Sequence, residues 1–192
     1  MNEKPIAAGR SSFGLIDTKK LFSELRLQEN TIFLDVACGS GAYSIAASEY
    51  ISEAGRIYAV DLWKEGIDNL KREITTKQLE NVYASVADVS KQIPIEDYSV
   101  DICLMAMVLH DLIQDNTAEG TLREVQRVLK PQGTLAIIEF KKIAGPHGPP
   151  IEIKISPKEL EKRLQPYSFR LTKTMDIGLY SYLSVFINQN DE

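Results

Sequence analysis

Short apolar runs alternate with amphipathic helical patterns along most of this 192-residue chain. Runs rich in apolar and β-branched residues predict strands over residues 31–36, 56–60, 82–86, 100–107 and 134–140. Apolar side chains at helical spacing predict helices over residues 16–27, 42–51, 63–75 and 117–129. Nearly continuous apolar strands separated by amphipathic helices are typical of a parallel sheet that is covered on both faces.

Residues at the ends of these segments refine the predicted helices. Asp17 is a candidate N-cap for the first helix, and Leu21, Phe22 and Leu25 form its apolar face. The helix over 117–129 is expected to stop at residues 130–133, Lys-Pro-Gln-Gly, which turn the chain into the fifth strand.

The last part of the chain departs from the alternation. Ser156 followed by Pro157 predicts a helix that runs to about Leu164. Two more strands follow over 169–174 and 182–188, and their short connection leaves no room for a crossover helix, so they should pair antiparallel. We therefore expect an α/β fold, a Rossmann-like doubly wound seven-stranded sheet that is mostly parallel with an antiparallel C-terminal strand.

Composition and charge narrow the classes of function. The chain is 44% hydrophobic and 26% charged, as expected for one globular domain, and its net charge of −5 argues against a general binder of nucleic acid. Cys38 and Cys103 lie far apart, in apolar contexts that indicate strand ends, and are expected to be reduced structural thiols. With no apolar signal core in residues 1–10 and no long apolar run, we expect a cytoplasmic protein without a membrane span.

The strongest functional signal is the stretch FLDVACGSGAYS, residues 33–44. Gly39 and Gly41 follow the first strand at the edge where open α/β sheets bind ligands, and they allow the backbone to approach a ligand closely. The dinucleotide fingerprint needs Gly or Ala at the position of Ser44. Asp35 would repel a diphosphate but attract an ammonium group, so a nucleoside that carries an amino acid is favoured.

Two more acidic residues end the next strands. Asp61 can accept hydrogen bonds from both hydroxyls of a ribose, and Asp88 can accept one from the amine of adenine, with Val89 against the ring. The simpler interpretation is that Asp35, Asp61 and Asp88 cap helices or turns. Their order at three carboxyl ends favours a ligand site.

These segments together resemble the class I S-adenosylmethionine-dependent methyltransferases over roughly residues 30–190. The resemblance is carried by LDVACGSG at 34–41, by the acids Asp61 and Asp88, and by RVLKPQGTLAIIEF at 127–140. With CLMAMVLHDL at 103–112, it is most similar to the small-molecule branch related to ubiquinone and menaquinone C-methyltransferases. Gln132 stands where that branch usually has glycine, with an effect expected to be local to the turn.

The resemblance implies S-adenosyl-L-methionine as cofactor, S-adenosyl-L-homocysteine as product and no metal. It also assigns residues to parts of the cofactor. The methionine moiety would be held by Asp35, Ala37, Cys38, Gly39 and Gly41, the ribose by Asp61, the adenosine by Leu62, Asp88 and Val89, and the region near the sulfonium by Met105 and Ala106.

A general base is needed only if the acceptor loses a proton, and His110, just after the fourth strand, is the candidate, with Asp111 to orient it. His110 can instead hydrogen-bond to the cofactor or the backbone without moving protons. His147 lies in the Pro/Gly-rich segment 141–155, a candidate lid, where a solvated loop histidine is the simpler interpretation.

The acceptor is expected to be a small organic molecule, since the sequence shows no large insertion for a substrate domain. Four apolar or aromatic residues could line its site, namely Phe13, Tyr43, Met107 and Ile143. The expected layout is a single methyltransferase domain with a helical cap over 1–29, a cofactor-binding core over 30–140, the lid loop over 141–155 and the terminal helix and strand pair over 156–192. The methylated atom and the oligomeric state stay open.

Two other functions remain as alternatives. The chain could be a methyltransferase-like protein that binds the cofactor without catalysis and works through interaction. It could also be an NAD(P)-dependent oxidoreductase, although Ser44 and Asp35 argue against that function.

Overall fold

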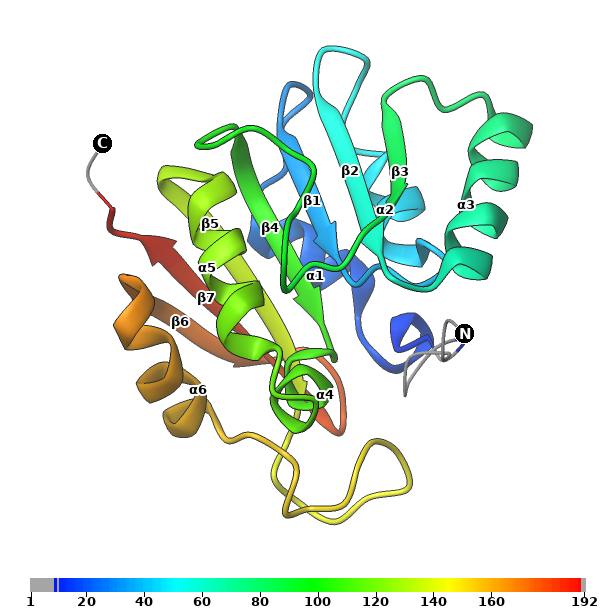
Figure 1. The fold of residues 1–192 in the computed structure, drawn as a ribbon. Helices are drawn as coiled ribbons and strands as arrows, with labels where there is room; N and C mark the ends of the chain where they lie inside the picture. The colour runs from blue at the N-terminus through cyan, green and yellow to red at the C-terminus, as the bar shows by residue number, and fades with distance from the viewer. Residues whose placement is uncertain (1–8, 10, 191–192) are drawn as a thin grey trace.

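A seven-stranded sheet with helices on both faces forms the centre of the computed structural model, which describes residues 9 and 11–190 (Figure 1). Residues 1–8 and 10 of the predicted N-terminal cap, and residues 191–192 of the predicted terminal segment, lie outside the described residues. The strands are β1 Ile32–Val36, β2 Arg56–Asp61, β3 Val82–Val86, β4 Val100–Ala106, β5 Leu129–Phe140, β6 Phe169–Asp176 and β7 Ser181–Asn188. Their order is β3-β2-β1-β4-β5-β7-β6.

The pairing of these strands confirms the predicted fold class. β1 to β5 pair parallel, and β7 pairs antiparallel with both β5 and β6. β7 is therefore the one strand of this sheet that runs opposite to the others. The carboxyl ends of the parallel strands lie along one edge of the sheet. The strand order reverses between β1 and β4, and open α/β sheets hold their ligands at this edge, next to that point.

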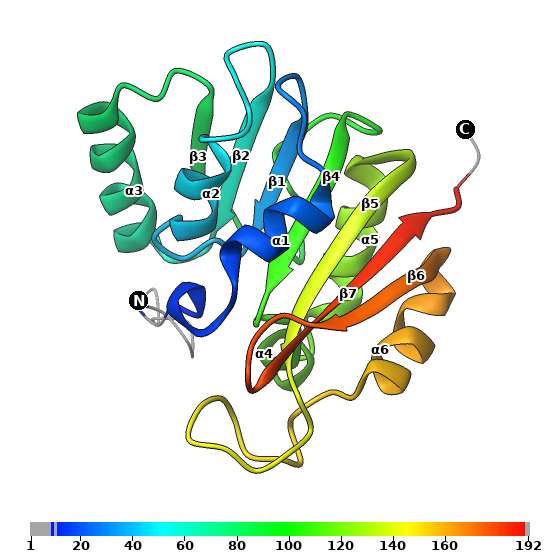
Figure 2. The same ribbon diagram turned by 180° about the vertical axis from the view of Figure 1, so that it is seen from behind.

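The helices divide between the two faces. α1 Thr18–Leu25, α2 Ala42–Ala47 and α3 Lys64–Lys77 cover one face (Figure 2), and α5 Ala118–Val128 and α6 Pro157–Leu164 cover the other. The short helix α4 Leu109–Gln114 lies at the edge where the parallel strands end. Two turns of 3₁₀ helix complete the described elements, η1 Phe13–Leu15 and η2 Gln165–Tyr167.

Local sequence signals explain two of the helix starts. Asp17 caps α1, because its side chain accepts a hydrogen bond of 3.0 Å from the backbone N–H of Lys20. Ser156 and Glu159 form a reciprocal capping box at α6, and Pro157 occupies its first turn. The apolar face predicted for α1 is also confirmed, since Leu21, Phe22 and Leu25 are buried.

The structure differs from the sequence prediction in three helical or turn regions. α2 ends at Ala47 rather than at residue 51, because the chain turns there and brings the buried side chain of Ile51 into the core. α4 was not predicted, since its few residues directly continue the apolar run of β4. Residues 130–133 belong to β5 but bulge from it, because Val100 pairs with Leu129 whereas Ile102 pairs with Thr134.

Two further observations concern single residues, and only the second differs from the prediction. Gln132, within the bulge, has a left-handed backbone with φ of 61°, which favours glycine. Cys103 lies in the middle of β4, paired with Leu34, rather than at a strand end.

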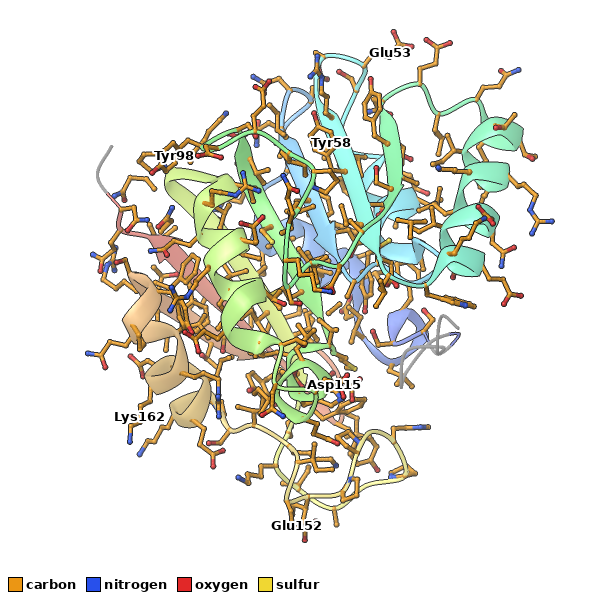
Figure 3. All side chains as sticks on the ribbon, viewed as in Figure 1. Glu53, Tyr58, Tyr98, Asp115, Glu152 and Lys162 are labelled. Atoms are coloured by element: carbon orange, nitrogen blue, oxygen red, sulfur yellow. The ribbon has the colours of Figure 1, made fainter. Side chains whose placement is uncertain are left out.

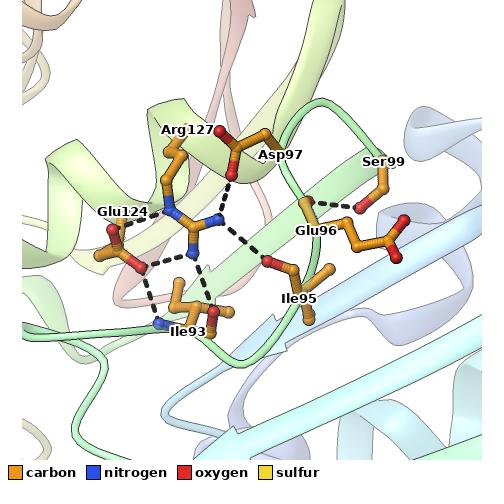
Figure 4. Close-up of polar contacts among 7 residues, drawn as sticks. All are labelled: Ile93, Ile95, Glu96, Asp97, Ser99, Glu124 and Arg127. Atoms are coloured by element: carbon orange, nitrogen blue, oxygen red, sulfur yellow. Dashed lines mark hydrogen bonds and ion pairs between the residues drawn. The ribbon is translucent and has the colours of Figure 1, made fainter.

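A loop over residues 87–99 connects β3 to β4 and is fixed by Arg127 of α5 (Figure 4). The guanidinium donates to the carbonyl oxygens of Ile93 and Ile95 at 2.8 and 2.9 Å. It also pairs with Glu124 and Asp97 at 2.6 Å each. This network holds the loop that begins directly after β3, at the ligand edge of the sheet.

The two edges of the sheet differ in what surrounds them. Figure 3 places Asp115, just after α4, and Glu152, in the loop after β5, at the edge where the parallel strands end. Glu53 lies at the opposite edge. The predicted lid loop therefore extends beyond the carboxyl ends of the strands. No helix in the described part of the chain combines the length and the apolar character needed to cross a membrane.

Candidate functional site

The turn after β1 contains the two glycines that the sequence singled out, and the structure gives them different roles. Gly39 and Gly41 have φ of 59° and 79°, and Ala37 beside them has φ of 55°. A Cβ placed on Gly39 would meet no atom within 4 Å, whereas one on Gly41 would collide with Leu70 of α3. Gly41 thus allows the helices to pack, and Gly39 leaves an open side for a ligand.

A cavity of about 50 Å³ lies beside this turn. Residues predicted to bind the cofactor form much of its wall, namely Asp35, Ala37, Cys38, Gly39 and Ala106. The segment before α1 closes another side, since Ser12 Oγ and Tyr43 Oη are hydrogen-bonded at 2.9 Å and both residues line the cavity. One water molecule occupies about 30 Å³ in the liquid. The cavity is only slightly larger than this, so only one end of a larger ligand can enter it.

Asp35 is the buried acid of this cavity, with only 1% of its surface exposed. Burial raises its pKa to about 7, although the hydrogen bond from Ser44 Oγ at 2.7 Å opposes the rise; the nearby charge of Asp61 adds to it. The carboxyl group therefore ionises near neutral pH and lacks a cationic partner among the described residues that interact with it. Ser44, which breaks the dinucleotide fingerprint, serves here as the partner of Asp35.

Asp61 ties the end of β2 to the glycine turn. Its Oδ2 accepts from the backbone N–H of Gly39 at 2.7 Å, and its Oδ1 accepts from that of Trp63 at 2.6 Å. Burial raises the pKa of Asp61, while these backbone hydrogen bonds oppose the rise. The turn-capping interpretation thus holds for part of the carboxylate. Since a carboxylate has about four acceptor positions, capacity for ligand hydroxyls remains. The link to Gly39 was not predicted.

The residues predicted for the adenosine lie in different environments. Leu62 is half exposed, directly after Asp61. Asp88 accepts from Ser90 and pairs with Lys91 at 2.9 Å. Burial alone would raise the pKa of Asp88, but Ser90 and Lys91 outweigh it and the pKa is lowered. Asp88 does not line the cavity beside Gly39.

Two further predicted cofactor residues point into the core instead. Val89 is buried in the apolar cluster beneath α5, and Met105 is fully buried in the same cluster. Neither lines the cavity, whereas Ala106, the next residue along β4, does. Alternation of side chains along β4 explains this difference, since successive residues of a strand point to opposite faces.

His110 in α4 belongs to a buried acid–histidine pair. Its Nδ1 lies 2.8 Å from Oε2 of Glu139, and its backbone N–H donates to Oε1 of the same residue at 3.2 Å. Asp111 Oδ1 is 3.6 Å from the other ring nitrogen, Nε2. Burial lowers the pKa of His110, but Glu139 and Asp111 more than offset this, so the pKa is raised above 6.5.

The sequence analysis predicted that Asp111 orients His110 and did not predict the contact with Glu139. Glu139 is completely buried at the end of β5 and contacts His110 twice, once at the ring nitrogen Nδ1 and once at the backbone N–H. The available signal was a single acid in the otherwise apolar run TLAIIEF. An acid buried in such a strand needs a partner.

A second cavity, of about 210 Å³, opens next to the first at the same edge of the sheet. Its apolar wall consists of Leu15, Met107, Phe140, Leu179 and Tyr180. Ser181 and His147 complete the lining. Met107 directly follows Ala106, which lines the first cavity, so consecutive residues line the two cavities.

The predicted acceptor residues divide between these cavities. Phe13 packs edge to face on Tyr43, with ring centroids 5.2 Å apart, beside the first cavity. Met107 lines the second. Ile143 is half exposed and lines neither. His147 is exposed but lines the second cavity, with its ring 6.2 Å from that of Tyr180.

The cysteines show no sign of reactivity. Cys38 and Cys103 are both free and buried, and burial raises the pKa of each thiol well above its ordinary value. Both are therefore protonated at neutral pH, so neither is an activated nucleophile.

Comparison with known families gives a consistent result. The family model described as "Methyltransferase domain" matches residues 34–137. A structure described as a SAM dependent methyltransferase from Aquifex aeolicus is 31% identical, covers 93% of both chains and superimposes with a TM-score of 0.84. A putative type 11 methyltransferase from Sulfolobus solfataricus, 23% identical with a TM-score of 0.74 and covering 93% of this chain and 95% of its own, shares the fold.

Curated relatives are longer than this chain. Demethylmenaquinone methyltransferase of Lactobacillus johnsonii is 27% identical over 128 residues, which are 67% of this chain and 51% of the relative. The corresponding protein of Staphylococcus saprophyticus is 29% identical over 121 residues, 63% of this chain and 49% of the relative. The chain thus spans about half the length of the curated relatives it matches.

Proposed function

This chain belongs to the class I S-adenosylmethionine-dependent methyltransferases, and we propose that it transfers a methyl group from this cofactor to a small organic acceptor. The observation that carries the proposal is the open side of Gly39 beside the buried carboxyl group of Asp35. The proposal assigns the cavity at this turn to the methionine end of the cofactor.

The residues present fit such a ligand. A cationic amine would pair with Asp35, whose pKa of about 7 leaves it ready to ionise when a positive charge arrives. Asp61 would accept ribose hydroxyls with its remaining lone pairs, and the exposed Leu62 would flank the nucleoside. Asp88 stays a proposed acceptor for the adenine amine, reached only if the ligand competes with Ser90 and Lys91.

The protein's own residues would align the acceptor and exclude water. When bound, the cofactor supplies a methyl group attached to a sulfonium sulfur, and this sulfur becomes a neutral thioether once the methyl group has been transferred. The chain mainly has to hold the acceptor in line and dry. His110 stays the proposed base if the acceptor loses a proton, and it would take the proton on Nε2, because Glu139 occupies Nδ1. His110 lines neither cavity, so this role requires an acceptor that reaches Nε2.

The acceptor is proposed to be a small molecule rather than a nucleic acid, since the chain carries a net charge of −5. The curated relatives are named for demethylmenaquinone. The match covers only about half of their length, so the proposal does not include that substrate. The proposed layout keeps residues 30–140 as the cofactor-binding core and 141–155 as a lid, in the cytoplasm.

Calorimetric titration with S-adenosylhomocysteine tests the cofactor assignment, with NADH as the comparison ligand. Tight binding of S-adenosylhomocysteine and weak binding of NADH is the expected result, and the reverse would favour the oxidoreductase. The variant Asp61→Asn removes the charge and turns one acceptor oxygen into an NH2 donor, so it also loses one of the backbone hydrogen bonds from Gly39 and Trp63. It should weaken binding roughly tenfold or more, the contribution of a hydrogen bond to a charged acceptor. Turnover to S-adenosylhomocysteine with a panel of acceptors then separates an enzyme from a binding protein without catalysis.

A further inference from the structure

We infer that the groove between α6 and β6 is a docking site for a protein partner, which it holds through an extended segment with acidic side chains at alternate positions. The groove is lined by one side of α6, by the first residues of β6 and by the residue that follows β7. None of its lining residues lines either cavity described above. The inference therefore goes beyond the proposed methyl transfer and does not depend on it.

The groove runs along the outermost strand of the sheet. β6 is the last strand in the order β3-β2-β1-β4-β5-β7-β6, so one of its sides has no neighbouring strand in this sheet. α6 lies beside β6 in both views (Figures 1 and 2). The space between them measures about 410 Å³, and ligand sites commonly measure about 300–1,000 Å³. A segment of a few residues can therefore enter it.

Positive charge is concentrated in this groove, although the chain carries a net charge of −5. Lys158 and Lys162 of α6 and Arg170 of β6 line it, and all three are exposed; Figure 3 shows Lys162 on the outer side of α6. Within the described part of the chain, none of the three takes part in an ion pair or a side-chain hydrogen bond. Glu161 is the acidic residue of the lining. Three cations against one acid favour a negatively charged partner.

The first residues of β6 also offer unused backbone groups. The backbone N–H of Gln189 donates to the carbonyl oxygen of Ser168 at 2.8 Å, so these two residues form a hydrogen-bonded pair between β6 and the end of β7. Hydrogen-bonded and non-hydrogen-bonded pairs alternate along an antiparallel ladder. The backbone groups of Arg170 therefore face β7, and those of Phe169 and Leu171 face the open side. An extended segment can pair with them as an additional strand.

The second half of β6 is closed to such pairing. A bulge between Leu171 and Lys173 interrupts the regular ladder. Lys173 pairs with Glu24 at 2.5 Å, and Asp176 pairs with Lys141 at 2.9 Å. Bulges and charged side chains are the features that keep outer strands from pairing with other chains. An added strand is therefore restricted to the part of β6 that borders the groove.

The spacing of the two lysines sets the pattern of the segment. Lys158 and Lys162 are four residues apart on α6, which is about 6 Å at 1.5 Å per residue. Alternate residues of a strand point to the same side and lie about 6.6–6.8 Å apart. Two acidic residues separated by one position can therefore meet both lysines while the backbone of the segment pairs with β6. A nucleic acid could meet the lysines but has no amide groups for the strand.

Two labelled peptides of identical composition test this pattern by fluorescence anisotropy with the full chain. Thr-Glu-Thr-Glu-Thr-Glu-Thr alternates its acids, and Thr-Thr-Glu-Glu-Glu-Thr-Thr groups them. We expect the alternating peptide to bind roughly threefold or more tightly, the effect of one additional exposed ion pair. Added salt should weaken its binding, because the charges in the groove are exposed.

Variants of the groove provide the second part of the test. The double variant Lys158→Glu/Lys162→Glu should weaken binding of the alternating peptide roughly tenfold or more, since two attractions become repulsions. Lys71→Glu/Arg72→Glu is the matched control, because it makes the same change of charge at exposed positions of α3, on the other face of the sheet. It should leave the affinity unchanged.

A peptide with N-methylated backbone amides tests the strand pairing, since it keeps the three acids but cannot donate hydrogen bonds to β6. It should bind much more weakly than the unmodified alternating peptide. Asp191→Asn/Glu192→Gln removes the two acids that follow Asn190 in the sequence, and this variant should bind the peptide at least as tightly as the wild type.

Three results would overturn the inference: equal affinities for the alternating and grouped peptides, binding that survives Lys158→Glu/Lys162→Glu, or binding that survives N-methylation. Tighter binding of a seven-nucleotide oligothymidylate than of the alternating peptide would also overturn it, in favour of a nucleic acid. Titration with S-adenosylhomocysteine keeps the two proposals apart. Its affinity should be unaffected by the Lys158→Glu/Lys162→Glu variant, and its failure to bind would count against the proposed function alone.

Discussion

Replacing Asp35 by Asn should make the free protein more stable and the cofactor complex weaker. The amide has the shape of the carboxyl group and can still accept the hydrogen bond from Ser44, but it carries no charge to bury. In the wild type, burial raises the pKa of Asp35 from 3.8 to about 7. This difference of about 3 in pKa lowers the free energy of unfolding by about 4 kcal/mol once Asp35 is ionised in both the folded and the unfolded protein.

The sign of this effect follows from proton binding. Between pH 4 and 7 the unfolded chain has released the proton that the folded protein still holds on Asp35, so stability falls as the pH rises. Above about pH 7 both states are ionised and the loss is constant. Asp35→Asn removes the dependence, so the stability difference between variant and wild type should grow by about 2 to 3 kcal/mol from pH 5 to pH 8.5.

Urea unfolding at both pH values measures this difference, and calorimetry with S-adenosylmethionine measures the cost to function. Loss of the charged partner should weaken cofactor binding roughly tenfold to a hundredfold. Asp88→Asn is the control, because Ser90 and Lys91 lower the pKa of Asp88 and the sign reverses. A stability difference for Asp35→Asn that is the same at pH 5 and pH 8.5 would refute the argument from burial.

The remaining predictions concern the glycine turn, the β5 bulge and the buried histidine pair. Gly39→Ala should cost only about 1 kcal/mol of stability for its left-handed backbone but should strongly reduce S-adenosylhomocysteine binding, because its Cβ points into open space. Gly41→Ala should lower the melting temperature further, because it also collides with a side chain of α3. Gln132→Gly should stabilise the protein by about 0.5–1 kcal/mol, because relief of the left-handed backbone at φ of 61°, about 1–2 kcal/mol, exceeds the entropic cost of glycine, about 0.5–1 kcal/mol; a thermal melt without a rise would contradict this. Glu139→Gln should shift the rise of turnover with pH to lower pH, because Glu139 raises the pKa of His110; an unmoved profile would exclude His110 as the base.

The sequence predicted the sheet well because its signals are local. The apolar runs, the caps at Asp17 and Ser156 and the short terminal connection each depend on neighbouring residues, and each is confirmed. Helix α4 escaped prediction because it lasts only six residues and continues an apolar strand. The bulge before Thr134 depends on register with β4, which no local pattern records.

The candidate site was predicted less completely, since its contacts join distant parts of the chain. The bond between Asp61 and Gly39 and the pair of His110 with Glu139 each join elements that only the folded sheet brings together. Met105 and Ala106 were treated alike from sequence, yet strand alternation buries one and leaves the other at the cavity.

The short stretch that precedes α1 connects the two cavities. Ser12 closes one cavity through its bond to Tyr43, and Leu15, within the same turn of 3₁₀ helix, forms a wall of the other. The backbone N–H of Leu15 donates to the carbonyl oxygen of Ser12 at 2.9 Å, so a molecule that displaces the backbone at Ser12 is expected to move Leu15 as well. Occupancy of either space must then alter affinity at the other by an equal factor, as thermodynamic reciprocity requires. Two separate compartments would in this way communicate through a single hinge of backbone.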